Sequence, residues 1–211
     1  MEVVITVLLI LAAYLLGSIP TSVWVGKWFY DIDIREKGSG NAGATNTIRI
    51  LGYKAGLPVF IIDVLKGFGA VEMAYLSPIQ PGTAWFINFQ ILLGLAVLIG
   101  HIFPLLAGFK GGKGVAALLG VIMTLTTGPA LLAFGIFLLV LLLFKYVSFG
   151  SMIAGLSYPF IVSFLYPSVS ASLKIASVIM ALLLIITHRK NINRLIKGEE
   201  SKAYFLFKKK G

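Results

Sequence analysis

Cysteine is absent from the sequence, and charged residues are scarce. Without cysteine the chain can form no disulfide, no thiolate zinc site and no cysteine nucleophile. Charged residues make up 12% of the 211 residues and apolar residues make up 58%. The charged share is about half of that in soluble domains, so polar side chains are too few to cover a surface that faces water. The composition therefore excludes a single soluble core, and its apolar content excludes a disordered chain.

Several motifs of hydrolytic and metal enzymes are missing too. The sequence has no G-x-S-x-G elbow and no H-E-x-x-H motif, and neither His101 nor His188 is followed five places on by an aspartate. Two histidines without suitably spaced carboxylates or thiols do not make a metal site. We therefore expect no metal, no other cofactor and no nucleic-acid partner.

Long apolar runs predict an all-α, polytopic membrane helix bundle, because a helix needs roughly 20 apolar residues to span a bilayer. Gly128-Pro129 favours a turn inside the run from 115 to 144 and hence seven spans. Some runs are shorter than a full span, so five or six spans are the alternatives. The seven runs cover residues 3–25, 55–76, 84–106, 115–127, 129–144, 149–166 and 171–187.

Basic residues indicate the orientation of this bundle. Of the 18 Lys and Arg residues, 16 lie in alternate connections or in the tail, which predicts an N-terminus outside and a C-terminus in the cytoplasm. Residues 1–5 carry Glu2 and no basic residue, so we expect the first span not to be a cleaved signal peptide. We predict one integral-membrane domain over 1–196 and a basic cytoplasmic tail over 197–211.

The first inner connection, from 28 to 53, is long, polar and rich in glycine. Residues 38–43 match G-x-G-x-x-G, but no strand precedes them and no βαβ unit fits between two spans, so a dinucleotide fold is not supported. Glycines also let backbone N–H groups converge on an oxyanion. We predict a phosphate cradle; the alternative is a flexible loop. Its candidate ligands are Gly38, Ser39, Gly40, Asn41, Gly43, Thr45, Asn46 and Arg49.

The second inner connection, 108–114, runs directly into the apolar stretch at Val115. Glycines ahead of a helix expose its unpaired N–H groups to an anion, and two lysines add positive charge. We predict a second phosphate site here, whereas the alternative is a pair of lysines that obey the positive-inside rule. The full G-x-x-x-x-G-K-[ST] pattern is missing, which disfavours nucleotide hydrolysis. The candidate residues are Lys110, Gly111, Gly112 and Lys113.

Three further groups of polar residues lie at the ends of the apolar runs or within them. If the last span continues as a helix, His188 and Asn191 share a face at its inner rim, where a histidine can bind phosphate or accept a proton. Taken alone, a helix end with cations at its negative pole is the favoured interpretation. Asp63 and Lys66, three residues apart in an apolar run, predict a buried structural pair, and His101 is predicted to be a packing residue.

Five segments of the chain resemble the PlsY family of bacterial membrane enzymes, which are acyl-phosphate:glycerol-3-phosphate acyltransferases. The resemblance runs in order, with family-like spacing, from about residue 14 to residue 196, and its first and fourth segments are together the most specific. The segments are GSGNAGATNTIRILG (38–52), DVLKG (63–67), GHIFP (100–104), GFKGGKGV (108–115) and HRKNIN (188–193).

The resemblance implies a seven-helix enzyme of the bacterial inner membrane with its active site facing the cytoplasm. It would transfer a fatty acyl group from acyl phosphate to the 1-hydroxyl of glycerol 3-phosphate, giving lysophosphatidate and phosphate, and a soluble enzyme would supply the acyl phosphate. The implied catalytic residues are Ser39, Lys113, His188 and Asn191. Substrate would be bound by Gly38, Gly40, Asn41, Gly43, Thr45, Asn46, Arg49, Lys110, Gly111, Gly112 and, more weakly, Ser148. The proton acceptor stays open between His188 and a substrate phosphate oxygen.

Two other classes of protein remain as alternatives. A transporter of an anionic phosphorylated solute would place polar groups near the bilayer midplane in paired halves, whereas the polar groups here gather at one rim. A membrane scaffold would use the basic and aromatic tail as an anchor on an anionic leaflet. Phosphate release that depends on both substrates would distinguish the enzyme from either.

Overall fold

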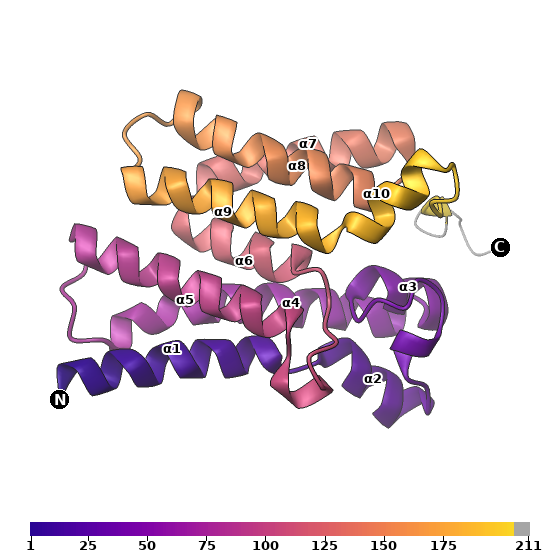
Figure 1. Cartoon of the computed structure of the whole chain (residues 1–211), viewed down its shortest axis with the longest axis horizontal. Helices are drawn as coiled ribbons and strands as arrows, with labels where there is room; N and C mark the ends of the chain where they lie inside the picture. The colour runs from indigo at the N-terminus through magenta and orange to yellow at the C-terminus, as the bar shows by residue number, and fades with distance from the viewer. Residues whose placement is uncertain (205–211) are drawn as a thin grey trace. The chain divides into compact units, whose positions relative to one another are not determined.

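The computed structural model describes residues 1–204, and within this part of the chain every regular element is helical (Figure 1). The predicted all-α class is therefore confirmed. The chain divides into two compact units, Met1–Thr127 and Gly128–Gly211. Residues 205–211, which belong to the predicted basic tail, lie outside the described residues.

Unit 1 is a bundle in which α1 lies beside α5, and α4 packs against both α5 and α6 (Figure 1). Three short 3-10 turns, η1 (Ile34–Glu36), η2 (Met73–Leu76) and η3 (Leu105–Ala107), lie in its connections. Its α-helices are α1 (Glu2–Ser18), α2 (Thr21–Tyr30), α3 (Ala44–Leu51), α4 (Tyr53–Glu72), α5 (Ala84–Ile102) and α6 (Val115–Leu125).

Glycines allow the helices of unit 1 to approach each other closely. A β-carbon at Gly67 of α4 would overlap the carbonyl oxygen of Ala117 in α6, and one at Gly120 of α6 would overlap that of Val64 in α4. Such reciprocal contacts of small residues are the usual way in which helices pack in lipid, where no hydrophobic effect drives helices together. The close crossing of α4 and α6 therefore depends on the absence of a β-carbon at Gly67 and at Gly120.

Unit 2 contains α7, α8 and α9, followed by a short helix α10 (Figure 1). Pro159 lies inside α8, which continues into a π-helical turn, η4 (Ile161–Leu165). The chain beyond α10 folds back, since the N–H of Ala203 donates to the carbonyl of Lys145 at 2.7 Å. The α-helices are α7 (Thr127–Phe144), α8 (Val147–Phe160), α9 (Ala171–Thr187) and α10 (Arg189–Ile196).

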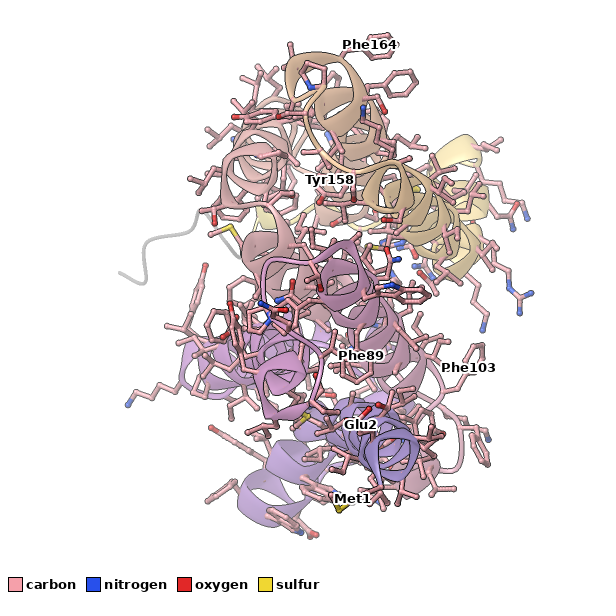
Figure 2. All side chains as sticks on the ribbon, turned by 90° about the vertical axis from the view of Figure 1, so that its left-hand side faces the viewer. Met1, Glu2, Phe89, Phe103, Tyr158 and Phe164 are labelled. Carbon is pink, nitrogen blue, oxygen red and sulfur yellow. The ribbon has the colours of Figure 1, made fainter. Side chains whose placement is uncertain are left out.

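Apolar side chains cover much of the outer surface of these helices. Phe103 and Phe164 point outward and are 53% and 75% exposed, whereas Phe89 lies inside unit 1 (Figure 2). By length and hydropathy, Ala84–Ala107, Thr127–Phe144 and Val147–Leu165 are each able to cross a membrane, and two bent helix pairs raise the number to five among the described residues. α6 is apolar but shorter. The count of seven spans stays a prediction.

Breaks in the helices correct several predicted boundaries. The run predicted over 3–25 is divided at Ile19-Pro20, where α1 and α2 meet at 43°, because a proline ring cannot continue a helix. The predicted break between 115 and 144 is present, but it lies at Thr126 rather than at Gly128-Pro129. Pro129 falls in the first turn of α7, where a missing N–H costs nothing.

Two further differences concern the polar segments. α9 and α10 meet at His188 with a bend of 59°, so the condition for a shared face, that the last span continues as one helix through His188 and Asn191, is not met. The connection expected as a loop also contains a helix, α3, which begins after Gly43 and ends at Gly52. That helix is amphipathic, and Asn46 and Thr47 on it are buried.

We predict that Gly67→Ala destabilises the protein by about 1–3 kcal/mol, because the added methyl group overpacks the α4–α6 crossing. Thermal unfolding in detergent measures the effect. Gly69→Ala is the matched control in the same helix, since nothing lies within 4 Å of its β-carbon position. The control should be neutral or slightly stabilising, and equal melting temperatures for the two variants would contradict the packing argument.

Candidate functional site

The first glycine-rich stretch, named glycine segment 1 (residues 38–43), forms tight turns between η1 and α3. Gly38 and Gly40 have φ angles of 59° and 70°, which residues with a β-carbon rarely adopt. Three of its N–H groups bond within the region: Ser39 to Asn46 Oδ1, Gly40 to the carbonyl of Lys37, and Gly43 to that of Asn41. An anion here would therefore meet side chains and the start of α3 rather than these three N–H groups.

Asn46 organises this segment from within α3. Its Nδ2 donates to the carbonyls of Ile34 and Lys37, both at 3.0 Å. Its Oδ1 accepts from the N–H of Ser39 at 2.9 Å and from Arg49 at 3.4 Å. Two donors and two lone pairs exhaust the hydrogen-bonding capacity of an asparagine side chain, so Asn46 shapes the segment and aims Ser39 and Arg49.

The second stretch, glycine segment 2 (residues 108–114), lies directly against glycine segment 1. A β-carbon at Gly112 would overlap Nε2 of His101 and would lie 2.7 Å from the carbonyl oxygen of Ala42. The N–H of Gly112 also donates to the carbonyl of His101 at 3.1 Å. The structure therefore brings together two segments that the sequence predicts as separate phosphate sites.

Both α3 and α6 begin beside this junction without a side-chain cap. Gly43 precedes α3 and Gly114, in the left-handed region, precedes α6. The first N–H groups of a helix carry partial positive charge and attract anions. Lys110 is exposed, whereas Lys113, Ser39, Asn41, Thr45 and Arg49 are partly buried. These residues belong to α3 and to the two glycine segments that meet at Gly112 and Ala42, and we refer to this part of unit 1 as the polar region.

A buried polar cluster lies within the helices of unit 1. Lys66 donates to Asp63 at 2.9 Å, to the carbonyl of Ile19 at 2.5 Å and to the hydroxyl of Thr21. Asp63 also accepts from Thr21 at 3.0 Å and lies 4.0 Å from Nδ1 of His101. The predicted pairing of Asp63 with Lys66 is confirmed, and His101 is a buried packing residue that connects this pair to Gly112.

An ion pair connects η1 to the second segment. Arg35 donates to both carboxylate oxygens of Asp33, at 3.0 and 2.7 Å, and its third donor reaches the carbonyl of Ala107 at 2.9 Å. The hydrogen bonds from Arg35 hold the pKa of Asp33 well below its usual range, and Asp33 in turn raises the pKa of Arg35. Neither residue belongs to a motif that points to chemistry in the sequence.

In unit 2, His188 lies at the junction of α9 and α10 and is 1% exposed. Its Nδ1 lies 2.8 Å from the carbonyl oxygen of Leu184. A carbonyl oxygen can only accept a hydrogen bond, so Nδ1 carries a proton, and the basic nitrogen of the neutral ring is Nε2.

Ser148 and Asn191 meet at the carboxylate of Glu200, which no sequence motif marks. Ser148 Oγ and Asn191 Nδ2 both donate to Glu200 Oε1 at 2.6 Å, and Arg194 Nε donates to Oε2 at 2.7 Å. Burial raises the pKa of Glu200, but the three hydrogen bonds outweigh it, so the pKa is below its usual value. Among the described residues, Oδ1 of Asn191 is buried without a hydrogen-bond partner.

The predicted site residues thus form two sets. The set in unit 1 comprises the two glycine segments with Thr45, Asn46 and Arg49, and the set in unit 2 comprises Ser148, His188 and Asn191. The described residues contain no group of three or more histidine, cysteine or acidic side chains that could hold a metal ion.

Comparison with known proteins gives consistent matches over nearly the whole chain. Residues 7–198 match the family model described as glycerol-3-phosphate acyltransferase. A glycerol-3-phosphate acyltransferase of Listeria welshimeri is 44% identical, over 95% of this chain and 98% of that protein. One of Chlorobaculum tepidum is 40% identical, over 93% and 96%.

Solved structures agree with these matches. The crystal structure of PlsY, an integral membrane glycerol 3-phosphate acyltransferase in its glycerol 3-phosphate form, is 37% identical and covers 93% of this chain and 94% of its own, with a TM-score of 0.83. Its lysophosphatidic acid form is 36% identical and also has a TM-score of 0.83. The resemblance noted in the sequence is confirmed, and the likeness, together with the apolar helices, indicates a membrane protein.

We predict that Glu200→Gln destabilises the protein by about 1–3 kcal/mol at pH 7. The glutamine side chain is neutral and has one acceptor oxygen, so it cannot replace the charge-assisted hydrogen bonds that both carboxylate oxygens of Glu200 accept. A pKa lowered by folding adds stability above the unfolded value, near 4.5, and this stability is lost as the pH falls through the folded value. The difference in melting temperature between wild type and variant should therefore be constant from pH 7 to about pH 5 and narrow as the pH falls below the unfolded value.

Glu199→Gln is the matched control, because Glu199 is the next residue in the chain to Glu200 and is exposed. It should melt like the wild type throughout this pH range. A difference between Glu200→Gln and the wild type that stays constant below pH 4.5 as well would show that the charge of Glu200 is not what stabilises the fold.

Proposed function

Because the chain belongs to the glycerol-3-phosphate acyltransferase family and is an acyltransferase, we propose that it takes its acyl group from acyl phosphate. The acyl group goes to the 1-hydroxyl of glycerol 3-phosphate, and the products are lysophosphatidate and inorganic phosphate. The observation that carries this proposal is the contact of Gly112 with Ala42, which joins two glycine segments in one polar region. A reaction between two phosphate-bearing molecules needs two neighbouring anion sites.

Arg49 and Lys113 supply the fixed positive charge of these sites. Nη1 of Arg49 donates to Oδ1 of Asn46 at 3.4 Å, which orients the Arg49 side chain. Its planar guanidinium group can make two parallel hydrogen bonds to a phosphate. Lys113 directly precedes Gly114, at the uncapped start of α6, where the helix dipole adds to its charge. Ser39, Asn41 and Thr45 provide neutral donors, and Lys110 with the backbone of Gly111 and Gly112 completes the second site.

The chemistry needs no nucleophilic side chain. The 1-hydroxyl oxygen attacks the acyl carbonyl carbon, a carbon–oxygen bond forms, and the carbon–oxygen bond to phosphate breaks. Phosphate is a good leaving group, so orientation and stabilisation of charge are enough to lower the barrier. This agrees with the absence of cysteine and of a G-x-S-x-G elbow from the sequence.

His188 and Asn191 act on the acceptor hydroxyl in this proposal. Nε2 of His188 is the basic nitrogen of the ring because Nδ1 donates a hydrogen bond to the carbonyl oxygen of Leu184. Oδ1 of Asn191 is a buried acceptor without a partner among the described residues, which a hydroxyl of glycerol 3-phosphate would satisfy. The proton of the hydroxyl goes to His188 or to a phosphate oxygen, whose second pKa is about 6.

We also propose an orientation of the chain in the membrane. Seven spans, an outer N-terminus and a cytoplasmic C-terminus would put both glycine segments on the inner side of the bacterial inner membrane. The basic residues of the inner connections support this arrangement. The acyl chain of the donor would lie along the apolar helix surfaces, and a soluble enzyme would deliver or make the acyl phosphate.

We predict that the purified protein releases phosphate from acyl phosphate only when glycerol 3-phosphate is present, with one lysophosphatidate formed per phosphate. Phosphate release and lipid product are measured together. Release without glycerol 3-phosphate would indicate a hydrolase. Uptake of glycerol 3-phosphate into vesicles without release would indicate a transporter, and activity with another acyl donor alone would overturn the choice of donor.

The same assay tests the two cations. Arg49→Ala and Lys113→Ala should each lower turnover by about a hundredfold or more, the scale for loss of one hydrogen-bond donor that stabilises charge in a transition state. Their melting temperatures should stay near that of the wild type, since both side chains lie at the polar region. Activity near wild type in both variants would contradict their role.

We predict that His188→Ala lowers the single-turnover rate at saturating substrates by about 100- to 10,000-fold if His188 is the general base. Rapid mixing and quenching measures the rate of acyl transfer. His188→Gln is the control for packing, because it keeps much of the volume but not the basic nitrogen. Retention of most of the rate in either variant would make a substrate phosphate the proton acceptor.

A further inference from the structure

We propose that Asp33 and Arg35 form a strut that holds glycine segment 2 against glycine segment 1. Both are positioning residues for the acyl transfer, so their role in catalysis rests on the proposed function. Neither residue belongs to the predicted phosphate sites. The strut acts through the carbonyl of Ala107, the last residue of η3 before Gly108.

The geometry of the guanidinium group explains why the residue is an arginine. Nε and Nη2 of Arg35 face the two oxygens of Asp33 in a bidentate pair, at 3.0 and 2.7 Å. This pairing fixes the plane of the group and points Nη1 at the carbonyl of Ala107, 72 residues away in the chain and 2.9 Å away in space. A lysine has a single point of charge and cannot make both contacts with this geometry.

The base of the strut is rigid. Asp33 also accepts from the backbone N–H of Arg35 at 3.0 Å. Ile34, which lies between the two residues, is fully buried in a cluster with Val23 and Ala42. Ala42 is the residue of glycine segment 1 that Gly112 approaches, so the strut and the contact between the segments share one support.

The far end of the strut holds the start of glycine segment 2. Gly108, the next residue after Ala107, has φ 62°, and Phe109 after it has φ 60°. Two successive residues in the left-handed region turn the chain sharply toward Lys110. A hydrogen bond to Ala107 therefore sets where this turn begins, and with it the position of the lysines that follow.

The occupied donors argue against direct contact between Arg35 and substrate. Three of its nitrogens point at oxygens of the protein, and its charge is balanced by Asp33. Lys27 offers a matched comparison, since its ammonium also lies near Asp33, at 3.3 Å, but its side chain is half exposed. Within residues 1–204, Lys27 makes no hydrogen bond to glycine segment 2. Removal of Lys27 should therefore leave the strut intact.

A double-mutant cycle tests the strut through activity. Asp33→Asn and Arg35→Lys should each raise the KM of at least one substrate about tenfold, the scale for loss of a charged hydrogen bond, with less change in kcat. The double variant should be no worse than either single one, and Lys27→Gln should match the wild type. Normal kinetics in Asp33→Asn with a loss in Arg35→Lys would overturn the proposal, since Arg35 would then act on substrate directly.

A distance measurement tests the strut without activity, and so separates its failure from failure of the proposed function. The chain has no cysteine, so spin labels at Glu36→Cys and Phe109→Cys, both exposed in the structure, report the separation of η1 from glycine segment 2 by pulsed electron paramagnetic resonance. Arg35→Lys and Asp33→Asn should broaden this distance distribution, and Lys27→Gln should not. An unchanged distribution in the first two variants would overturn the strut, whatever the enzyme's substrates are.

Discussion

The buried Lys66 ammonium is the interaction on which unit 1 depends. An ammonium group has three donors, and those of Lys66 reach Asp63, Thr21 and the carbonyl of Ile19. The carbonyl of Ile19 is available to Lys66 because the helix breaks at Pro20. Charge inside an apolar bundle is costly unless it is paired and fully bonded, so the break between α1 and α2 and the ion pair in α4 stabilise each other.

This pair also determines where the polar region lies. Asp63 faces His101, and the ring of His101 lies against Gly112, which in turn approaches Ala42. A continuous series of packed groups thus leads from the middle of α4 to the junction of the glycine segments. Glycine is required at Gly112 because a β-carbon would overlap the His101 ring, so its function here is close approach rather than flexibility.

The features that could be predicted from sequence are those that depend on residues close together in the chain. Apolar runs identify the helices, and the run 171–187 matches α9 to the residue. Two charges three residues apart in an apolar run predict the Asp63–Lys66 pair. Contacts between distant residues leave no such pattern: nothing local to Glu200 indicates that it binds Ser148, 52 residues away. The helix α3 was missed because its polar residues resemble a loop, although Gly43 and Gly52 mark its ends.

The same distinction applies to the chemistry of glycine segment 1. Its composition suggests a cradle of backbone N–H groups, yet those of Ser39, Gly40 and Gly43 hold the turns together. Because Asn46 uses all of its hydrogen bonds on the protein, it acts as an internal template, and the positive charge must come from Arg49 and from the start of α3. In the function proposed above, a phosphate site built in this way would be rigid before substrate arrives. Rigidity suits a reaction that relies on holding two substrates in line rather than on a reactive side chain.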